Sequence, residues 1–141
     1  MTARILSALG FEGAVVSMTF CSDPEIRVLN RGHRGLDRAT DVLSFPQEHM
    51  SEGAFVKGSP ASAGWLKNRG HSNPPLELGD IVISRDTLKR QAAEYGVTED
   101  EELARLLIHG ILHLLGWDHQ KAAERKRMRG LEDELLTSFT D

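Results

Sequence analysis

The pattern of apolar and polar positions along the chain predicts three short strands. Residues 14–20 (AVVSMTF) form an apolar and β-branched run that is typical of a strand. Residues 41–45 (DVLSF) predict a second strand, which Pro46 stops, and residues 79–84 (GDIVIS) predict a third. We therefore expect a small sheet whose strands come from separate parts of the sequence.

Two short helices are predicted before and between these strands. A helical start covers about residues 3–9. Ser22, Asp23 and Pro24 signal the start of a second helix, because an N-cap side chain followed by proline in the first turn favours helix formation. This helix is expected over about residues 25–30, and a glycine-punctuated turn should follow it.

The C-terminal half of the chain is predicted to be helical. A helix over residues 85–95 ends at Gly96, and Thr98 with Glu101 forms a capping box for the next helix. Over residues 103–115 that next helix is apolar on almost every face. We therefore expect it to be the central, largely buried helix that packs against the sheet.

The rest of the chain divides into a long irregular segment and a last helix. Residues 47–78 are rich in Gly, Ser, Pro and Asn and show no sustained period, which predicts a long loop. Such loops in compact domains tend to be functional or disordered. This loop can therefore be a cover over a cleft or a flexible insertion. The last helix is expected over about residues 121–136, with an apolar face formed by Met128, Leu131 and Leu135.

Length and composition favour one soluble domain in the cytoplasm. A chain of 141 residues with 40% hydrophobic content can bury one core and is short for two domains. No apolar run approaches the roughly 20 residues of a membrane span, and residues 1–13 lack the pattern of a signal peptide. Cys21 is the only cysteine, so no internal disulfide can form. The net charge of −4, taken alone, argues mildly against a nucleic-acid partner.

Three histidines have the spacing of a metal site. On a helix, His109 and His113 lie nearly on the same face, so both can bind one ion. Gly116 can end that helix in a left-handed conformation and let the chain bring His119 back to the same ion. Three imidazoles leave a fourth tetrahedral position for water, which is the arrangement of catalytic zinc. We predict one zinc ion per chain, although nickel, cobalt or copper also suits three histidines.

Two other interpretations fit the same histidines. They can be core residues that happen to align, but they would then need buried hydrogen-bond partners, which a shared metal supplies. The spacing His-x-x-x-His-x-x-Gly-x-x-His also matches the metzincin proteases. Those enzymes carry a glutamate directly after the first histidine as general base, and this chain has Gly110 there. A zinc peptidase is therefore disfavoured.

Three stretches of the chain together resemble one known family. Residues 109–119 (HGILHLLGWDH) are similar to the signature of the YbeY family of bacterial rRNA maturation endoribonucleases. Residues 29–46 (LNRGHRGLDRATDVLSFP) resemble the second block of that family, and residues 79–84 resemble its third. The blocks occur in the order of the family, and the resemblance extends from about Ala14 to the end of the chain, apart from the long loop.

The resemblance implies a fold, a metal and a substrate. It implies an α+β fold in which about four to five helices pack around a small mixed sheet and the central buried helix carries the metal motif. It implies that the three histidines bind a metal, and that the protein acts in 3′-end maturation of 16S rRNA on the small ribosomal subunit and in ribosome quality control. Arg34 corresponds to the arginine that the family places beside the metal, where a guanidinium can bind a phosphodiester and stabilise its transition state. Without the resemblance, Arg34 would be read as a surface arginine in a polar turn.

Several other polar residues are candidates for roles near the metal. Asp118 can orient His119 or cap the turn, and Asp80 can orient a ligand, act as base or make only structural hydrogen bonds. Basic residues follow the metal motif directly. They can contact an RNA backbone or form only a solvated helix face. These basic residues are Lys121, Arg125, Lys126, Arg127 and Arg129.

The sequence leaves three questions open. No residue is identified as the general base, and the oligomeric state is not indicated. A ribosome-assembly factor with a structural zinc and little nuclease activity of its own is a second interpretation of the same motifs. The chain also departs from the family pattern, because the segment before the first strand and the loop over residues 47–78 differ in length, and His33 stands where an aromatic residue commonly precedes the arginine.

Overall fold

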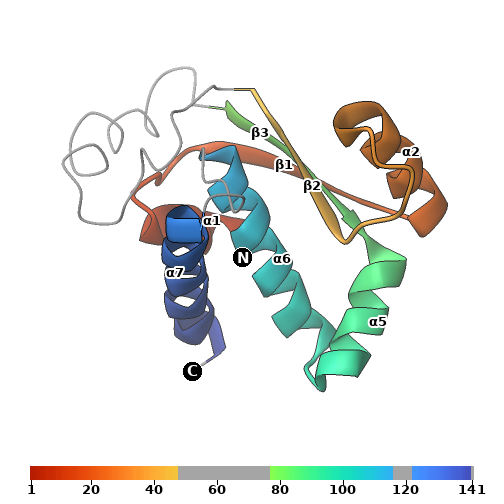
Figure 1. Ribbon diagram of the computed structural model, residues 1–141. Helices are drawn as coiled ribbons and strands as arrows, with labels where there is room; N and C mark the ends of the chain where they lie inside the picture. Colours follow the sequence, from red (N-terminus) through yellow and green to blue (C-terminus); the bar gives the residue numbers. More distant parts are fainter. Residues whose placement is uncertain (48–76, 116–121, 141) are drawn as a thin grey trace.

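The computed structural model describes residues 1–47, 77–115 and 122–140 of the chain (Figure 1). Within these ranges the chain forms a three-stranded sheet and five helices, which confirms the predicted α+β class. No helix within them is long and apolar enough to cross a membrane. In chain order the elements are α1 (Thr2–Ala8), β1 (Val15–Cys21), α2 (Asp23–Arg34), β2 (Val42–Pro46), β3 (Glu77–Ser84), α5 (Arg85–Tyr95), α6 (Glu99–Leu114) and α7 (Ala122–Thr140).

The sheet is mixed, as predicted, and β3 is its central strand. β1 pairs with β3 in parallel, and β2 pairs with β3 in the antiparallel sense. Apolar residues Ile81 and Ile83 of β3 are fully buried. Val42 lies opposite Ile83 and Ser44 lies opposite Ile81, so these four positions share the face of the sheet on which α6 packs.

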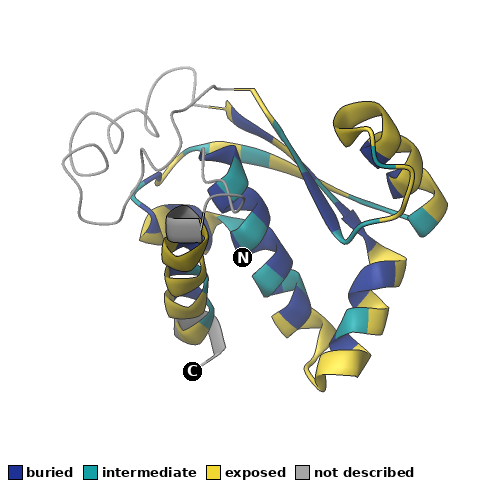
Figure 2. Cartoon of the chain, in the orientation of Figure 1, coloured by how far each residue is buried: buried dark blue, intermediate teal, exposed yellow. Residues whose placement is uncertain are grey.

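Helix α6 is the centre of the molecule, as its apolar sequence predicted. It contacts β2 and β3 and also α1, α5 and α7, whereas α2 packs against β3 and α5. Figure 2 shows α6 as mostly buried, while α2, α5 and α7 each keep an exposed face. The predicted apolar face of α7 is confirmed, since Met128, Leu131 and Leu135 are all buried in the core cluster.

Helix α2 is longer than predicted, and this changes the position of Arg34. Its start matches the sequence signal, because Ser22 and Glu25 form a reciprocal capping box. The helix continues to Arg34 and ends at Gly35, whose φ of 72° is left-handed. The prediction that it ends near Asn30 was wrong, since Gly32 is accommodated inside the helix. Arg34 therefore lies in the last helical turn and not in a polar turn.

The boundaries of two other predicted segments also differ from the structure. The long irregular segment was predicted to reach residue 78, but β3 already begins at Glu77 and Leu78 is fully buried. Its remaining part, residues 48–76, lies outside the described residues. The last helix runs to Thr140, beyond the predicted end near residue 136.

A polar cluster joins the starts of α2 and α5. The Asp23 carboxylate accepts hydrogen bonds from the hydroxyls of Ser84 at 2.5 Å and Thr87 at 2.6 Å, and it pairs with Arg90 at 2.8 Å. The Asp23 backbone N–H in turn donates to the carboxylate of Asp86 at 2.9 Å. The hydroxyl hydrogen bonds from Ser84 and Thr87 lower the pKa of Asp23 below its ordinary value.

We expect Asp23→Asn to destabilise the fold in a pH-dependent way. A carboxylate with a lowered pKa contributes stability above its unfolded pKa, near pH 4, and loses that contribution as the pH falls through its folded pKa. The substitution should therefore lower the free energy of unfolding at pH 7 by about 1–3 kcal/mol, and the difference from wild type should shrink below about pH 4. Urea unfolding at a series of pH values measures this.

Asp37→Asn is the matched control for that series. Asp37 pairs with Arg27, but both side chains are more than half exposed, so its loss should lower the free energy of unfolding much less than the loss of Asp23. Equal effects of the two substitutions at pH 7 would contradict the role given to Asp23.

Gly79 permits the close pairing of β2 with β3. Its φ is 143°, and a Cβ built there would lie 2.2 Å from the carbonyl oxygen of Phe45 and 2.9 Å from Cα of Pro46. Both neighbours are backbone atoms, so neither can move aside without disturbing the strand pairing.

Gly79→Ala should therefore lower the free energy of unfolding by about 3 kcal/mol or more, because it combines backbone strain with overlap. Gly130→Ala is the control, since a Cβ at that position of α7 meets nothing within 4 Å. Alanine there should stabilise the helix by up to about 1 kcal/mol. Thermal unfolding followed by circular dichroism compares the two, and similar melting temperatures would contradict this account of Gly79.

Candidate functional site

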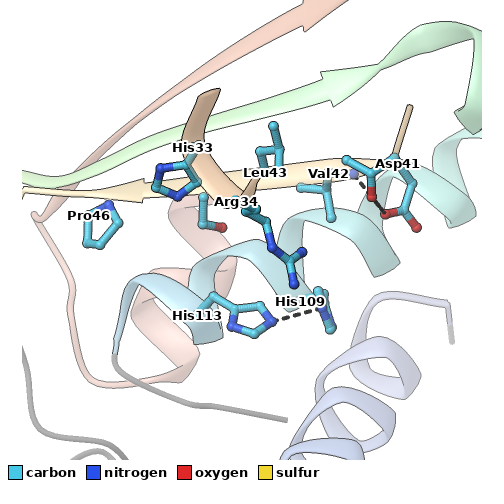
Figure 3. A pocket seen from close by; sticks show the side chains of 10 residues that line it. His33, Arg34, Asp41, Val42, Leu43, Pro46, His109 and His113 are labelled. Atoms are coloured by element: carbon cyan, nitrogen blue, oxygen red, sulfur yellow. Dashed lines mark hydrogen bonds between the residues drawn. The ribbon is translucent and has the colours of Figure 1, made fainter. Parts of the chain in front are cut away.

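A cavity of about 430 Å³ opens between the end of α2, the edge strand β2 and α6 (Figure 3). His33 and Arg34 line it from α2, and His109 and His113 line it from α6. The remaining wall comes from residues 40–44 and Pro46. The structure therefore brings three of the predicted site residues, namely Arg34 and two of the three histidines, to one cleft.

The two histidines of α6 point their Nε2 atoms at each other. These atoms are 3.0 Å apart, and the rings meet at an interplanar angle of 73°. Zinc–nitrogen bonds of about 2.0–2.1 Å at a tetrahedral angle separate two ligand nitrogens by about 3.3 Å. The pair therefore has nearly the spacing that one ion requires, as the four-residue separation along the helix predicted.

A third side chain, which the sequence reasoning missed, contacts this pair. Oε1 of Glu132 in α7 lies 2.6 Å from Nδ1 of His109. Both side chains are mostly buried, with 29% of His109 and 18% of Glu132 exposed. The available signal was weak: Glu132 directly follows Leu131 and lies four residues after Met128, so it borders the apolar face that packs on α6.

Arg34 reaches the cleft from the opposite wall. Because α2 continues to this residue, the last turn of the helix presents its side chain at the cavity. Figure 3 shows the guanidinium pointing toward the two histidines. The Asn30 side chain donates a hydrogen bond of 2.9 Å to the Arg38 carbonyl, which holds the turn that follows the helix.

Gly110 lies at a close approach of α6 to the sheet. A Cβ there would lie 3.1 Å from Cδ1 of Ile81 and 3.3 Å from Oγ of Ser44, and the Ser44 hydroxyl donates to the Gly110 carbonyl at 2.9 Å. A glutamate at this position would meet the sheet. The geometry thus adds a physical reason to the sequence argument against a metzincin-like general base.

Comparison with known proteins identifies the family. The family model described as endoribonuclease YbeY matches residues 2–140. The chain belongs to the YbeY family. A relative from Pelotomaculum thermopropionicum, named Endoribonuclease YbeY, is 45% identical over 134 residues, which cover 94% of this chain and 78% of that protein. A relative of the same name from Geobacillus thermodenitrificans is 44% identical, covering 91% and 74%.

The matched proteins differ in length. A relative from Myxococcus xanthus, also named Endoribonuclease YbeY, is 47% identical over 131 residues, but the match covers 93% of this chain and only 38% of that protein. The solution structure of TM1509 from Thermotoga maritima is 25% identical, with a TM-score of 0.48, and the match covers 96% of this chain and 84% of that one.

Asp80 does not lie at the cleft of this YbeY-family chain. Asp80 is exposed on β3, and its side chain lies on the opposite face of the strand from those of Ile81 and Ile83, which face α6. Its neighbour across the strands is Phe45, on the face of the sheet away from the histidine helix. The expectation that Asp80 orients a ligand or acts as base therefore finds no support in its position.

His33 both replaces an aromatic ring and lines the cleft. Its ring packs against Phe45 with centroids 4.3 Å apart, as an aromatic residue would, and the side chain also lines the cavity. Thr40 and Ser44 both make hydrogen bonds, since Thr40 donates to Asp41 at 3.4 Å and Ser44 donates to the Gly110 carbonyl at 2.9 Å.

The remaining predicted residues fall mostly outside the described part of the chain. Asp118, His119 and Lys121 lie in the undescribed range 116–121, so their predicted roles stay predictions. Among the residues that the structure describes, no three His, Cys, Asp or Glu side chains gather into a metal-binding group. Arg125 is described and exposed on α7, which suits both a contact with RNA and a solvated helix face.

Proposed function

We propose that this protein is a metal-dependent endoribonuclease that cleaves single-stranded RNA and acts in 3′-end maturation of 16S rRNA and in ribosome quality control. One observation carries the proposal: two imidazole Nε2 atoms converge at 3.0 Å in a cleft into which an arginine side chain points. Membership of the endoribonuclease YbeY family supports the RNA substrate. We propose the small ribosomal subunit as the partner and the cytoplasm as the place of action.

The donor set fits a divalent transition metal. We propose one zinc ion per chain, bound by His109 and His113 together with His119 as the third ligand. Imidazole nitrogens suit zinc, and they suit nickel, cobalt and copper as well. The ligand type therefore supports a transition metal of this group, of which we propose zinc. When bound, such an ion supplies a hydroxide near neutral pH and polarises a phosphate oxygen.

Arg34 is proposed to bind the scissile phosphodiester across the cleft from His109 and His113. A guanidinium can donate two parallel hydrogen bonds to the non-bridging phosphate oxygens, which fixes the phosphorus atom relative to the histidine wall. As negative charge builds on those oxygens in the transition state, the fixed positive charge stabilises it. Contacts from Lys121 and Arg125 to the RNA backbone would extend the binding site, since they need no particular base sequence.

The two alternative functions are less well supported. A structural zinc site is closed by four protein ligands, whereas His109 is 29% exposed and both histidines line an open cleft. An assembly factor with a structural zinc therefore does not account for the cavity beside Arg34. A metzincin-like peptidase carries its general base at the position of Gly110, which here packs against the sheet, so a peptidase would need its base to come from elsewhere.

His113→Ala should abolish stoichiometric metal binding, because two of three ligands cannot hold a transition metal tightly. Inductively coupled plasma mass spectrometry of the purified proteins measures this, and about one equivalent is expected in the wild type. His33→Phe is the control, since phenylalanine keeps the ring contact with Phe45 and removes a cleft histidine that is not a proposed ligand. Equal metal content in wild type and His113→Ala would contradict the proposed site.

Arg34→Lys should lower the single-turnover cleavage rate by about 10²–10³, because lysine cannot make the bidentate contact, while metal content stays at the wild-type level. The substrate is a single-stranded RNA, assayed beside a duplex of the same sequence that should be cut more slowly. Arg27→Lys is the matched control, since Arg27 pairs with Asp37 at the surface. If the metal-loaded wild type leaves RNA intact and chelation unfolds it, the assembly-factor alternative replaces this proposal.

A further inference from the structure

His109 is contacted at both of its ring nitrogens, and the two contacts come from different helices. Nδ1 lies 2.6 Å from Oε1 of Glu132 in α7, and Nε2 lies 3.0 Å from Nε2 of His113, one turn away in α6. The ring is therefore held between a carboxylate on one side and the second proposed metal ligand on the other.

An ionised carboxylate at this contact would determine which ring nitrogen carries the proton. An ionised glutamate can only accept hydrogen bonds, so the contact with Glu132 requires a proton on Nδ1 of His109. In the neutral ring, Nε2 then keeps its lone pair and faces His113. This is the tautomer that can bind a cation at Nε2, and in the metal-free protein the lone pair can accept a hydrogen bond from Nε2–H of His113.

We infer that Glu132 is a positioning residue, which fixes His109 in the tautomer and orientation that bind the metal. The inference rests on the proposed metal site. A carboxylate on the second nitrogen also makes the imidazole a more basic ligand, and loss of such a partner typically weakens metal binding ten- to 100-fold.

The apolar core places this carboxylate. Glu132 borders the buried face of α7, which Met128, Leu131 and Leu135 form against the core, and α7 contacts α6 directly. A glutamate that only joined the two helices would act on stability alone. Glu132 contacts the ring of His109, whose other nitrogen faces His113. We therefore assign Glu132 a second role, which predicts changes in the His109 tautomer and in metal affinity.

The test compares Glu132→Ala and Glu132→Gln with wild type, and uses Asp133→Asn as the matched control. Asp133 is the exposed neighbour on the same helix, so its substitution also removes a negative charge but leaves His109 untouched. Circular dichroism first verifies that each protein is folded. Nitrogen-15 shifts of the imidazoles, recorded on metal-free protein over a series of pH values, report the His109 tautomer. Competition titration with Zn²⁺ then gives the dissociation constants.

Glu132→Ala should shift His109 toward the Nε2–H tautomer and raise the Zn²⁺ dissociation constant about ten- to 100-fold. Glu132→Gln keeps an oxygen acceptor for Nδ1–H, so it should keep the tautomer and give a smaller loss of affinity. Asp133→Asn should match wild type in both measurements.

Two results would contradict the role of Glu132, and a third would contradict only the proposed metal-dependent function. An unchanged His109 tautomer in Glu132→Ala, or a dissociation constant within about twofold of wild type, would show that Glu132 merely joins two helices. If the wild type takes up no metal, the proposed function fails. The tautomer measurement needs no metal and still decides whether Glu132 places the proton.

Discussion

The close approach of α6 to the sheet is the constraint on which the rest of the structure depends. Gly110 permits it, because a Cβ at that position would lie 3.1 Å from the side chain of Ile81, and the Ser44 hydroxyl binds the Gly110 carbonyl. With one face of the helix fixed against β2 and β3, the neighbouring face that carries His109 and His113 turns toward the cleft. His109 and His113 therefore owe their direction to a residue that has no side chain, and the same packing excludes a general base there.

Local signals in the sequence were sufficient to predict most helices and strands and the pairing of two histidines at the site. The capping residues Ser22 and Thr98 and the terminal glycine Gly96 act within one turn of the chain, so the helix ends could be read without knowledge of the fold. The pairing of His109 with His113 is equally local, because a helix places residues four apart on one side. These predictions needed only the assumption that the segment is helical.

The features that were missed depend on contacts between distant segments. Glu132 lies 23 residues from His109, and only the docking of α7 on α6 brings them together. Asp80 was expected beside the site because its strand lies there, but strand alternation, set by Ile81 and Ile83 facing α6, turns it to the other face. The extension of α2 to Arg34 depends on Gly35 as the residue that ends the helix, and the predicted glycine-punctuated turn did not show which glycine that is.

The two walls of the cleft differ in the polar contacts that hold them, although both pack on the sheet. The histidine wall is part of the apolar core, since α6 contacts the sheet and three other helices, and the Glu132 contact is set in place by the packing of α7. The arginine wall belongs to α2, whose start is tied to α5 through the Asp23 carboxylate and whose last turn carries Arg34. Hydrophobic packing does not titrate, whereas the Asp23 cluster depends on an ionised carboxylate. The placement of the proposed phosphate contact opposite the proposed metal site therefore depends on both apolar packing and a charged cluster.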